Sequence, residues 1–283
     1  MSYDTLVDTA TLAAHLLDPD WRVVDCRFEL GDPDAGALQF ERGHIPGAVY
    51  AHLDHDLSAP RTPWSGRHPL PEPAVLAATF GRLGIGPGTQ VVAYDESGGT
   101  YAARLWWLLR WLGHREVAVL DGGLKSWRAE RRALATTRGE VPPREFAARP
   151  DHDAHVTADD VASLLAHGQM LLIDARAAER FEGRIEPLDP KAGHVPGARS
   201  YPYSQNLGAD GRFLPAPELR ARLGALLGAS PASALVSMCG SGVTACHTLL
   251  ALSVAGLEGA RLYAGSWSEW CRDPGRPVAT GPN

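Results

Sequence analysis

The two halves of this chain carry the same short motifs in the same order. An apolar stretch that ends in Asp-x-Arg occupies residues 23–27 and recurs at 172–176. A Gly-His-(Ile/Val)-Pro-Gly-Ala run begins at Gly43 and recurs at Gly193. In both halves short apolar stretches alternate with helical patterns, which is typical of parallel sheets flanked by helices. Two copies of this length indicate a duplicated domain rather than a solenoid.

The repeat therefore predicts an α/β protein with two tandem domains, each a parallel sheet flanked by helices. The chain has 283 residues, enough for two domains, and 45% of them are hydrophobic, which is ample for two cores. We expect a first domain at residues 1–138, a linker at 139–155 and a second domain at 156–283. The linker stretch is rich in Pro and Gly and has no apolar periodicity.

Charge and hydropathy exclude several classes of protein. The net charge of -6 argues against a nucleic-acid partner bound through a broad basic surface. No apolar run approaches the roughly 20 residues that span a bilayer. Residues 1–4 lack the basic and apolar regions of a signal peptide. We therefore expect a cytoplasmic chain with no nucleic-acid and no membrane partner.

The chain has four cysteines, and their spacing does not fit a zinc site because no Cys-x-x-Cys pair occurs. In a reducing compartment a disulfide framework is not expected. We expect Cys26 and Cys246 to be structural, and Cys271 to be an incidental thiol that could oxidise if exposed. We expect no cofactor and no metal site; the candidate metal ligands that we set aside are His52, Asp54, His55 and Asp56.

Cys239 opens the motif with the most chemical content, Cys-Gly-Ser-Gly-Val-Thr-Ala-Cys at 239–246. Residues 234–238 before it indicate a buried strand, and a helix is expected from Thr244 to about Val254. Two glycines allow a tight loop whose backbone N–H groups converge at a helix N-terminus. A cysteine there is expected to react as the thiolate. Taken alone, the motif leaves a buried structural cysteine open as the other interpretation.

The run 239–246 resembles the active-site loop of the rhodanese-type sulfurtransferases, and the likeness extends over nearly the whole chain. It is more similar to the mercaptopyruvate branch, because the thiosulfate branch usually has Arg-Lys where this chain has Gly240-Ser241. The resemblance implies two tandem rhodanese-like domains. It also implies that Cys239 takes a sulfane sulfur from a small-molecule donor as a persulfide. The expected acceptor is cyanide or a thiol such as thioredoxin or glutathione. The expected donor is 3-mercaptopyruvate, with thiosulfate as the alternative.

The resemblance also implies substrate-binding residues. Arg180 lies where the family has a substrate-binding arginine, and a guanidinium suits a carboxylate or a thiosulfonate. Backbone N–H groups of the loop are expected to stabilise charge on sulfur. The expected substrate-binding residues are Arg180, Gly240, Gly242, Val243, Thr244 and Ala245. Asp189 stands where the mercaptopyruvate branch has a second arginine, and Arg184 or Lys191 are the candidates to replace it.

Mercaptopyruvate enzymes have been discussed in terms of an Asp-His-Ser relay, and the matching residues here are Asp54, His68 and Ser241. A histidine oriented by a carboxylate can manage the proton of a nearby hydroxyl. Two alternatives stay open: His68 only lines a cleft, or His52 or His55 takes its place. The histidines of the two Gly-His motifs, His44 and His194, are expected to be structural. They occur in both halves, whereas only the second half has the cysteine.

The first half has Asp95 at the position of Cys239, so we expect it to be catalytically silent. Asp95 cannot carry a sulfane sulfur. Two other functions were weighed. A phosphatase of the related fold needs an arginine six residues after its cysteine, where this chain has Ala245. A non-catalytic binding module fits the first half but not the second. Formation of thiocyanate from a donor and cyanide would separate a sulfurtransferase from both.

Overall fold

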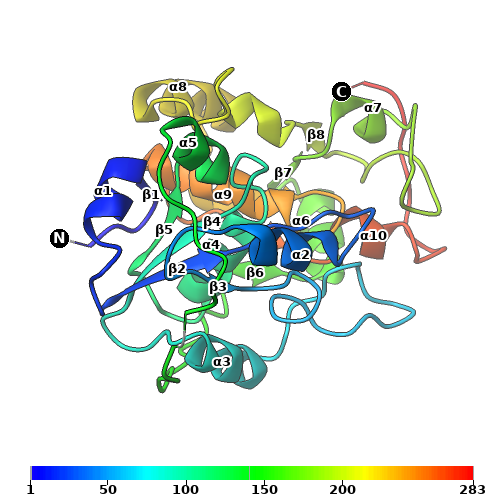
Figure 1. The fold of residues 1–283 in the computed structure, drawn as a ribbon. Helices are drawn as coiled ribbons and strands as arrows, with labels where there is room; N and C mark the ends of the chain where they lie inside the picture. Colours follow the sequence, from blue (N-terminus) through cyan, green and yellow to red (C-terminus); the bar gives the residue numbers. More distant parts are fainter. Residues whose placement is uncertain (1, 140, 283) are drawn as a thin grey trace. The chain divides into compact units, whose positions relative to one another are not determined.

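The computed structural model describes residues 2–139 and 141–282, and the chain divides into two compact units (Figure 1). The first unit comprises the described residues up to Ala59 with Leu70–Asp151 and Ala209–Phe213. The second comprises Pro60–Pro69, His152–Gly208 and the described residues from Leu214 onward. Each unit contains a five-stranded parallel sheet with helices. The predicted α/β fold, with one parallel sheet in each half, is confirmed.

The first unit arranges its strands in the order β1-β5-β4-β2-β3, and its core combines apolar residues of the sheet with those of the helices. Its elements are β1 (Leu6–Val7), α1 (Thr9–Ala14), β2 (Trp21–Asp25), α2 (Ala35–Arg42), β3 (Val49–Tyr50), α3 (Pro73–Arg82), β4 (Gln90–Tyr94), α4 (Ala102–Trp111), β5 (Val117–Leu120) and α5 (Gly123–Ala129).

The second unit repeats this order as β6-β10-β9-β7-β8 and has its own core. Its elements are β6 (His155–Val156), α6 (Ala158–Ala166), β7 (Leu171–Asp174), α7 (Ala178–Phe181), β8 (Arg199–Ser200), the 3₁₀ helices η1 (Tyr203–Asn206) and η2 (Ala232–Ala234), α8 (Ala216–Leu227), β9 (Leu235–Met238), α9 (Thr244–Val254), β10 (Arg261–Tyr263) and α10 (Ser266–Trp270).

The middle strands, β4 and β9, are buried along their whole length, as expected for strands covered on both faces of a parallel sheet. β9 pairs with β7 on one side and β10 on the other. Ligands of open α/β sheets bind beyond the carboxyl ends of the strands. The loop that follows β9 therefore begins at the middle of the edge where chemistry is expected.

The two Gly-His motifs enter β3 and β8, and their histidines are buried structural groups. His44 stacks on Phe40 at 3.9 Å between ring centroids, and its Nδ1 lies 2.7 Å from the Phe40 carbonyl oxygen. His194 stacks in the same way on Phe181 at 3.7 Å, with Nδ1 2.8 Å from the Phe181 carbonyl oxygen. The structural role predicted for both histidines is confirmed.

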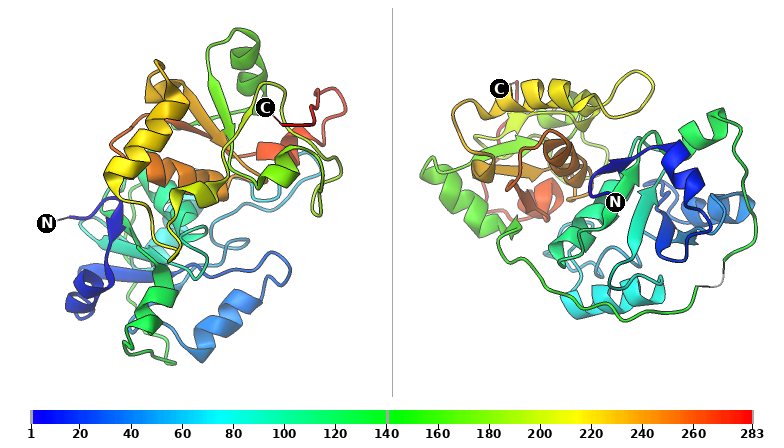
Figure 2. Two further views of the ribbon diagram at one scale, coloured as in Figure 1. Left: turned by 90° about the horizontal axis from the view of Figure 1, so that it is seen from above. Right: turned by 90° about the vertical axis from the view of Figure 1, so that its left-hand side faces the viewer.

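Residues 141–151, in the Pro-rich stretch after α5, are extended (Figure 2) and form hydrogen bonds to the rest of the first unit. Arg144 N–H donates to the Gly81 carbonyl at 2.9 Å, and Arg149 N–H donates to Leu112 at the same distance. Asp151 N–H donates to Trp111, also at 2.9 Å. This stretch up to Asp151 is thus part of the first unit's hydrogen-bonded structure.

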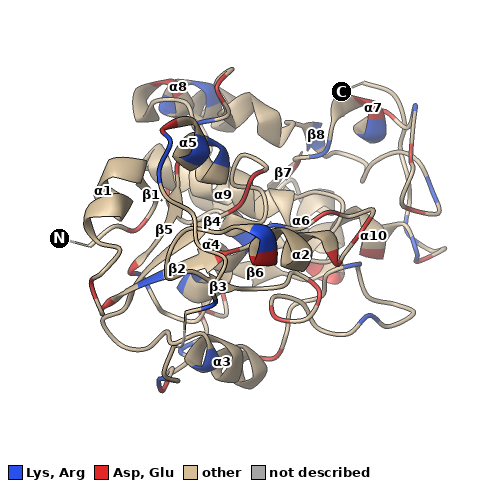
Figure 3. Ribbon diagram, in the orientation of Figure 1, with Lys and Arg blue, Asp and Glu red and all other residues tan. Residues whose placement is uncertain are grey.

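Charged residues of both signs are interspersed along the helices and loops (Figure 3). Within the described part of the chain, no helix combines the length and apolar character that crossing a membrane requires.

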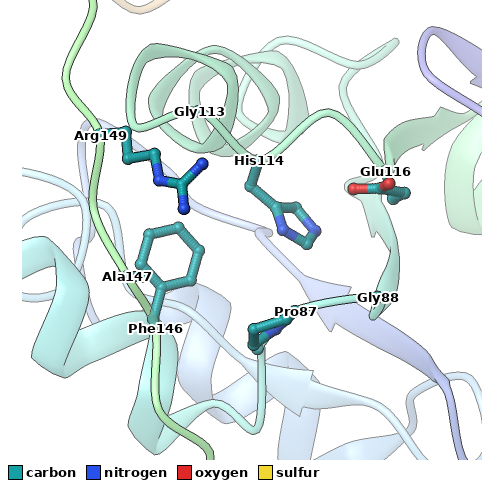
Figure 4. Close-up of a pocket in the computed structure, with 9 residues that line it drawn as sticks. Pro87, Gly88, Gly113, His114, Glu116, Phe146, Ala147 and Arg149 are labelled. Carbon is teal, nitrogen blue, oxygen red and sulfur yellow. The ribbon is translucent and has the colours of Figure 1, made fainter.

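His114 follows α4 and lines a cavity of the first unit with Pro87, Phe146 and Arg149 (Figure 4). The ring is buried, and its Nε2 lies 2.9 Å from the carbonyl oxygen of Thr89. Burial lowers the pKa of His114 below its ordinary value of 6.5. The neutral ring is therefore favoured in the folded protein.

We expect this histidine to weaken the fold in mild acid. As the pH is lowered through about 6.5, the unfolded chain binds a proton at His114 more readily than the folded chain does. The free energy of unfolding therefore decreases as the pH decreases. His114→Gln keeps a donor for Thr89 but cannot titrate. Its free energy of unfolding should vary less across that window, by up to about 1.4 kcal/mol per pH unit. Urea denaturation of both proteins from about pH 5 to 8 measures this; parallel curves would contradict it.

Candidate active site

Cys239 directly follows β9 and opens a loop that ends where α9 begins. The observed helix, Thr244–Val254, has the predicted bounds. Cys239 is 2% exposed, and the Gly242 N–H donates to its Sγ at 3.2 Å. Gly242 has φ +76°, and a Cβ there would lie 2.4 Å from the Ala264 carbonyl oxygen, so only glycine fits. The sulfur thus lies in a tight loop at the positive end of an 11-residue helix.

The first three residues of α10 fix this loop through three hydrogen bonds. Ser266 Oγ accepts from the Cys239 N–H at 3.1 Å, and Trp267 N–H donates to the Cys239 carbonyl at 3.0 Å. Ser268 N–H donates to the Gly240 carbonyl at 2.9 Å. Ser266 has φ +54°, which is unusual for a serine, whereas the matching residue of the first unit is Gly123 at φ +56°. The serine keeps the strained conformation where its hydroxyl contacts the cysteine backbone.

In the first unit the matching loop is filled by its own side chain. The Asp95 carboxylate accepts backbone hydrogen bonds from Ser97, Gly99, Tyr101 and Ala102 at 2.7–3.0 Å. These N–H groups already donate to a carboxylate of the protein, so they are not available to bind an external anion.

Arg180 lies beside the Cys239 loop. A Cβ built on Gly240 would be 3.5 Å from Arg180 Nη1 and 3.7 Å from its Nη2. Nη2 also binds Glu186 Oε1 at 2.7 Å and Asp189 Oδ2 at 3.3 Å. Asp189 is therefore directed at the predicted substrate arginine and is not a surface residue, since its side chain is 1% exposed.

Neither sequence candidate for the second cation is at this position. Arg184 is 59% exposed and pairs with Glu182, and Lys191 is exposed. The second cation beside the loop, after Arg180, is Arg67, whose guanidinium pairs with Asp189. Sequence reasoning missed Arg67. The available signal was an arginine next to the candidate histidine in a chain whose expected second arginine is replaced by an acid.

Arg67 and Arg180 belong to a six-residue arginine–carboxylate cluster. Its members are Arg67, Arg176, Arg180, Asp174, Glu186 and Asp189, linked by ion pairs in one continuous series. Burial opposes the charge of Arg176, but Asp174, Glu186 and the nearby Cys239 outweigh it and raise the pKa of Arg176. The cluster holds three guanidinium and three carboxylate groups, so it adds no net charge when all are ionised.

His68 and Ser241 are in contact, although 173 positions separate them in the sequence. His68 Nδ1 lies 2.7 Å from Ser241 Oγ, and both residues are buried. Asp54 belongs to the first unit, where its N–H donates to His52 Nδ1 at 3.1 Å. His52 in turn contacts the Pro33 carbonyl through Nε2 at 3.1 Å. Among the sequence candidates, it is thus His68 that meets the loop serine.

The other three cysteines are buried. Cys246 donates to the Gly242 carbonyl from within α9, at 3.2 Å, and Cys26 follows β2. Cys271 is fully buried in the core of the second unit, so the condition of exposure under which it could oxidise is not met. Across residues 2–139 and 141–282, no group of three or more His, Cys, Asp or Glu residues is arranged to hold a metal ion.

Comparison with known proteins agrees with this geometry. The family of rhodanese-like domains matches the chain twice, over residues 8–130 and 157–273. The chain therefore belongs to the rhodanese family.

Relatives of known name span nearly the whole chain. A Pseudomonas aeruginosa protein named "Probable 3-mercaptopyruvate sulfurtransferase" is 51% identical over 99% of this chain and 100% of its own. A Mycobacterium tuberculosis protein, whose assigned name is thiosulfate sulfurtransferase SseB, is 40% identical over 98% of this chain and 97% of its own. The crystal structure of SseA from Escherichia coli, a 3-mercaptopyruvate sulfurtransferase, superposes with a TM-score of 0.82 at 34% identity, covering 94% of this chain and 100% of that one.

Proposed function

We propose that this chain transfers a sulfane sulfur from 3-mercaptopyruvate, through a persulfide on Cys239, to a thiol or to cyanide. The observation that carries the proposal is the environment of the Cys239 sulfur, which accepts from Gly242 N–H in a glycine loop at the N-terminus of α9. Family membership and the names of the relatives support the same activity. The chain is an enzyme of the sulfurtransferase group.

In the first half-reaction the Cys239 thiolate attacks the thiol sulfur of the donor. A sulfur–sulfur bond forms and the carbon–sulfur bond breaks. Its electron pair goes to carbon, which leaves as the enolate of pyruvate. The thiol proton passes to that carbon, so the products are a deprotonated persulfide and pyruvate. We assign the transfer of this proton to Ser241 and His68, which lie 2.7 Å apart.

In the second half-reaction a nucleophile removes the outer sulfur and releases the Cys239 thiolate. Backbone N–H groups from Gly240 to Ala245 stabilise the charge on sulfur in both steps. Arg180 binds the donor's anionic group. The acceptor is cyanide or a thiol such as thioredoxin or glutathione. The first domain, residues 1–138, takes no sulfur, because Asp95 stands where the nucleophile would be.

Charge favours mercaptopyruvate over thiosulfate. The cluster beside the loop pairs each of its three guanidinium groups with a carboxylate group, so it offers no surplus of cations for a dianion and suits a donor with one carboxylate better. Gly240 and Ser241 also lack the basic pair that the thiosulfate branch has in this loop.

Steady-state cyanolysis with both donors tests the proposal. We expect thiocyanate from either donor, with kcat/KM higher for mercaptopyruvate by about tenfold or more, a difference of about 1.4 kcal/mol in transition-state stabilisation. With mercaptopyruvate as the donor, pyruvate should form in equal amount with thiocyanate. Absence of thiocyanate with both donors would overturn sulfur transfer. A clear preference for thiosulfate would contradict mercaptopyruvate as the donor but would not contradict sulfur transfer.

A further inference from the structure

The segment at residues 60–69 is built into the second unit, next to the catalytic loop. The Arg67 N–H donates to Ser268 Oγ at 3.0 Å, and the N–H of Ser268 holds the Gly240 carbonyl at 2.9 Å. Gly66 packs so closely that a Cβ there would lie 2.6 Å from the Gly265 carbonyl oxygen. The backbone of this segment and that of the loop are therefore connected through the same serine.

The Arg67 side chain reaches the residue that replaces the expected second arginine. Its Nη1 pairs with Asp189 Oδ1, and the other oxygen of that carboxylate accepts from Arg180 at 3.3 Å. The Arg67 side chain is 10% exposed and that of Asp189 is 1% exposed. One buried carboxylate thus orients two guanidinium groups that come from distant parts of the sequence.

The two guanidinium groups converge over Gly240. A Cβ at this glycine would lie 2.7 Å from Arg67 Nη2 and 3.5 Å from Arg180 Nη1. Within the described ranges, neither of these two nitrogens has a hydrogen-bond partner, and the buried Nε of Arg67 also lacks one. Of these donors only the Arg67 Nε is fully buried, so the two amino groups remain accessible to a ligand. A buried ion pair is weak evidence of a purely stabilising role. An anion bound over Gly240 would satisfy both amino groups.

We propose that Arg67 is a second donor-binding residue, which together with Arg180 holds the carboxylate of the 2-oxo-3-thiol acid over Gly240. This inference rests on the proposed function and deepens it. Asp189 positions both arginines, so an acid at this position is compatible with a mercaptopyruvate donor. The same geometry accounts for glycine at 240, because any larger side chain there would displace Arg67.

The test compares Arg67→Ala with Arg180→Ala and with the matched control Arg184→Ala, an exposed arginine of the same unit. We expect the KM for mercaptopyruvate to rise about tenfold or more in the first two variants, with kcat changed much less. The inhibition constant of pyruvate should rise in parallel, because it reports carboxylate binding without sulfur chemistry. Arg67→Lys should recover only part of the loss, since the planar fork is absent. The control should match wild type in all measurements.

Two further variants keep the inference falsifiable if Arg67→Ala folds poorly. Arg67→Ala combined with Asp189→Arg returns the second guanidinium to the position expected from the family and should lower KM again. Gly240→Ala retains both arginines but forces Arg67 aside, and it should raise KM and the pyruvate constant together. Unchanged KM and pyruvate inhibition in the folded Arg67 and Gly240 variants would overturn the role of Arg67. Failure of wild type to form a persulfide would instead overturn the proposed function.

Discussion

Replacing Cys239 with serine will abolish persulfide formation and reduce turnover with either donor to about one-thousandth or less of wild type. Cys239 provides the nucleophile of the proposed reaction, and loss of a nucleophile removes the covalent step altogether. A serine hydroxyl also ionises far less readily than a thiol at neutral pH. Intact-mass analysis after treatment with mercaptopyruvate should find one added sulfur atom on wild type and none on the variant.

The matched control is Cys246→Ser, which keeps a donor for the Gly242 carbonyl that Cys246 contacts at 3.2 Å. It should retain the added sulfur and most of the turnover. All four cysteines are buried, so the two variants, rather than exposure, identify the cysteine that carries the sulfur. A sulfur atom that persists on the Cys239 variant would place the carrier elsewhere and sink the assignment.

The fold could be predicted from the sequence because the signals that define it are local and occur twice. Apolar stretches of strand length, each followed by a helical pattern, are repeated in both halves, and β4 and β9 lie in the middle of matching sheets. The cysteine loop occurs only once, but it could be predicted because its signals are also local. The strand before it, the glycines within it and α9 after it all lie within 20 consecutive residues.

Arg67, a partner of that loop, could not be predicted, and His68 was expected only from the resemblance to the family, because both come from a distant segment. They lie in a short stretch that belongs to the second unit, although its neighbours in sequence belong to the first. No hydrophobic periodicity in the sequence indicates that this stretch belongs to the other unit. Comparison with the family directed attention to residues near Asp189, whereas the guanidinium that pairs with it comes from position 67.

The sequence pattern also does not predict which side chains form hydrogen bonds with backbone groups. Asp95 was recognised as unable to carry sulfur, but not as the acceptor of four backbone N–H groups of its own loop. Aligning the two repeats places Ser266 opposite Gly123. That this serine adopts a positive φ, which favours glycine, can be seen only in the structure.

Replacing His68 with alanine should slow mercaptopyruvate turnover by about 10²–10⁴-fold, the usual contribution of a general acid–base group. The ring lies 2.7 Å from Ser241 Oγ and touches the loop through that hydroxyl. The donor's thiol must lose a proton and the departing carbon must gain one. With thiosulfate the leaving group is sulfite, which needs no carbon protonation, so the loss should be smaller for that donor.

The readout that separates proton transfer from simple packing is this difference between donors. Ser241→Ala should give a similar loss, and the double variant should be little worse than either single one, because residues that act as a unit are not additive. His167→Ala, an exposed histidine on the same unit, serves as the control and should match wild type. Equal losses with both donors, or additive effects of the two substitutions, would mean that His68 only supports the loop. Rapid-quench measurement of pyruvate in a single turnover assigns the effect to the first half-reaction, where the relay is required.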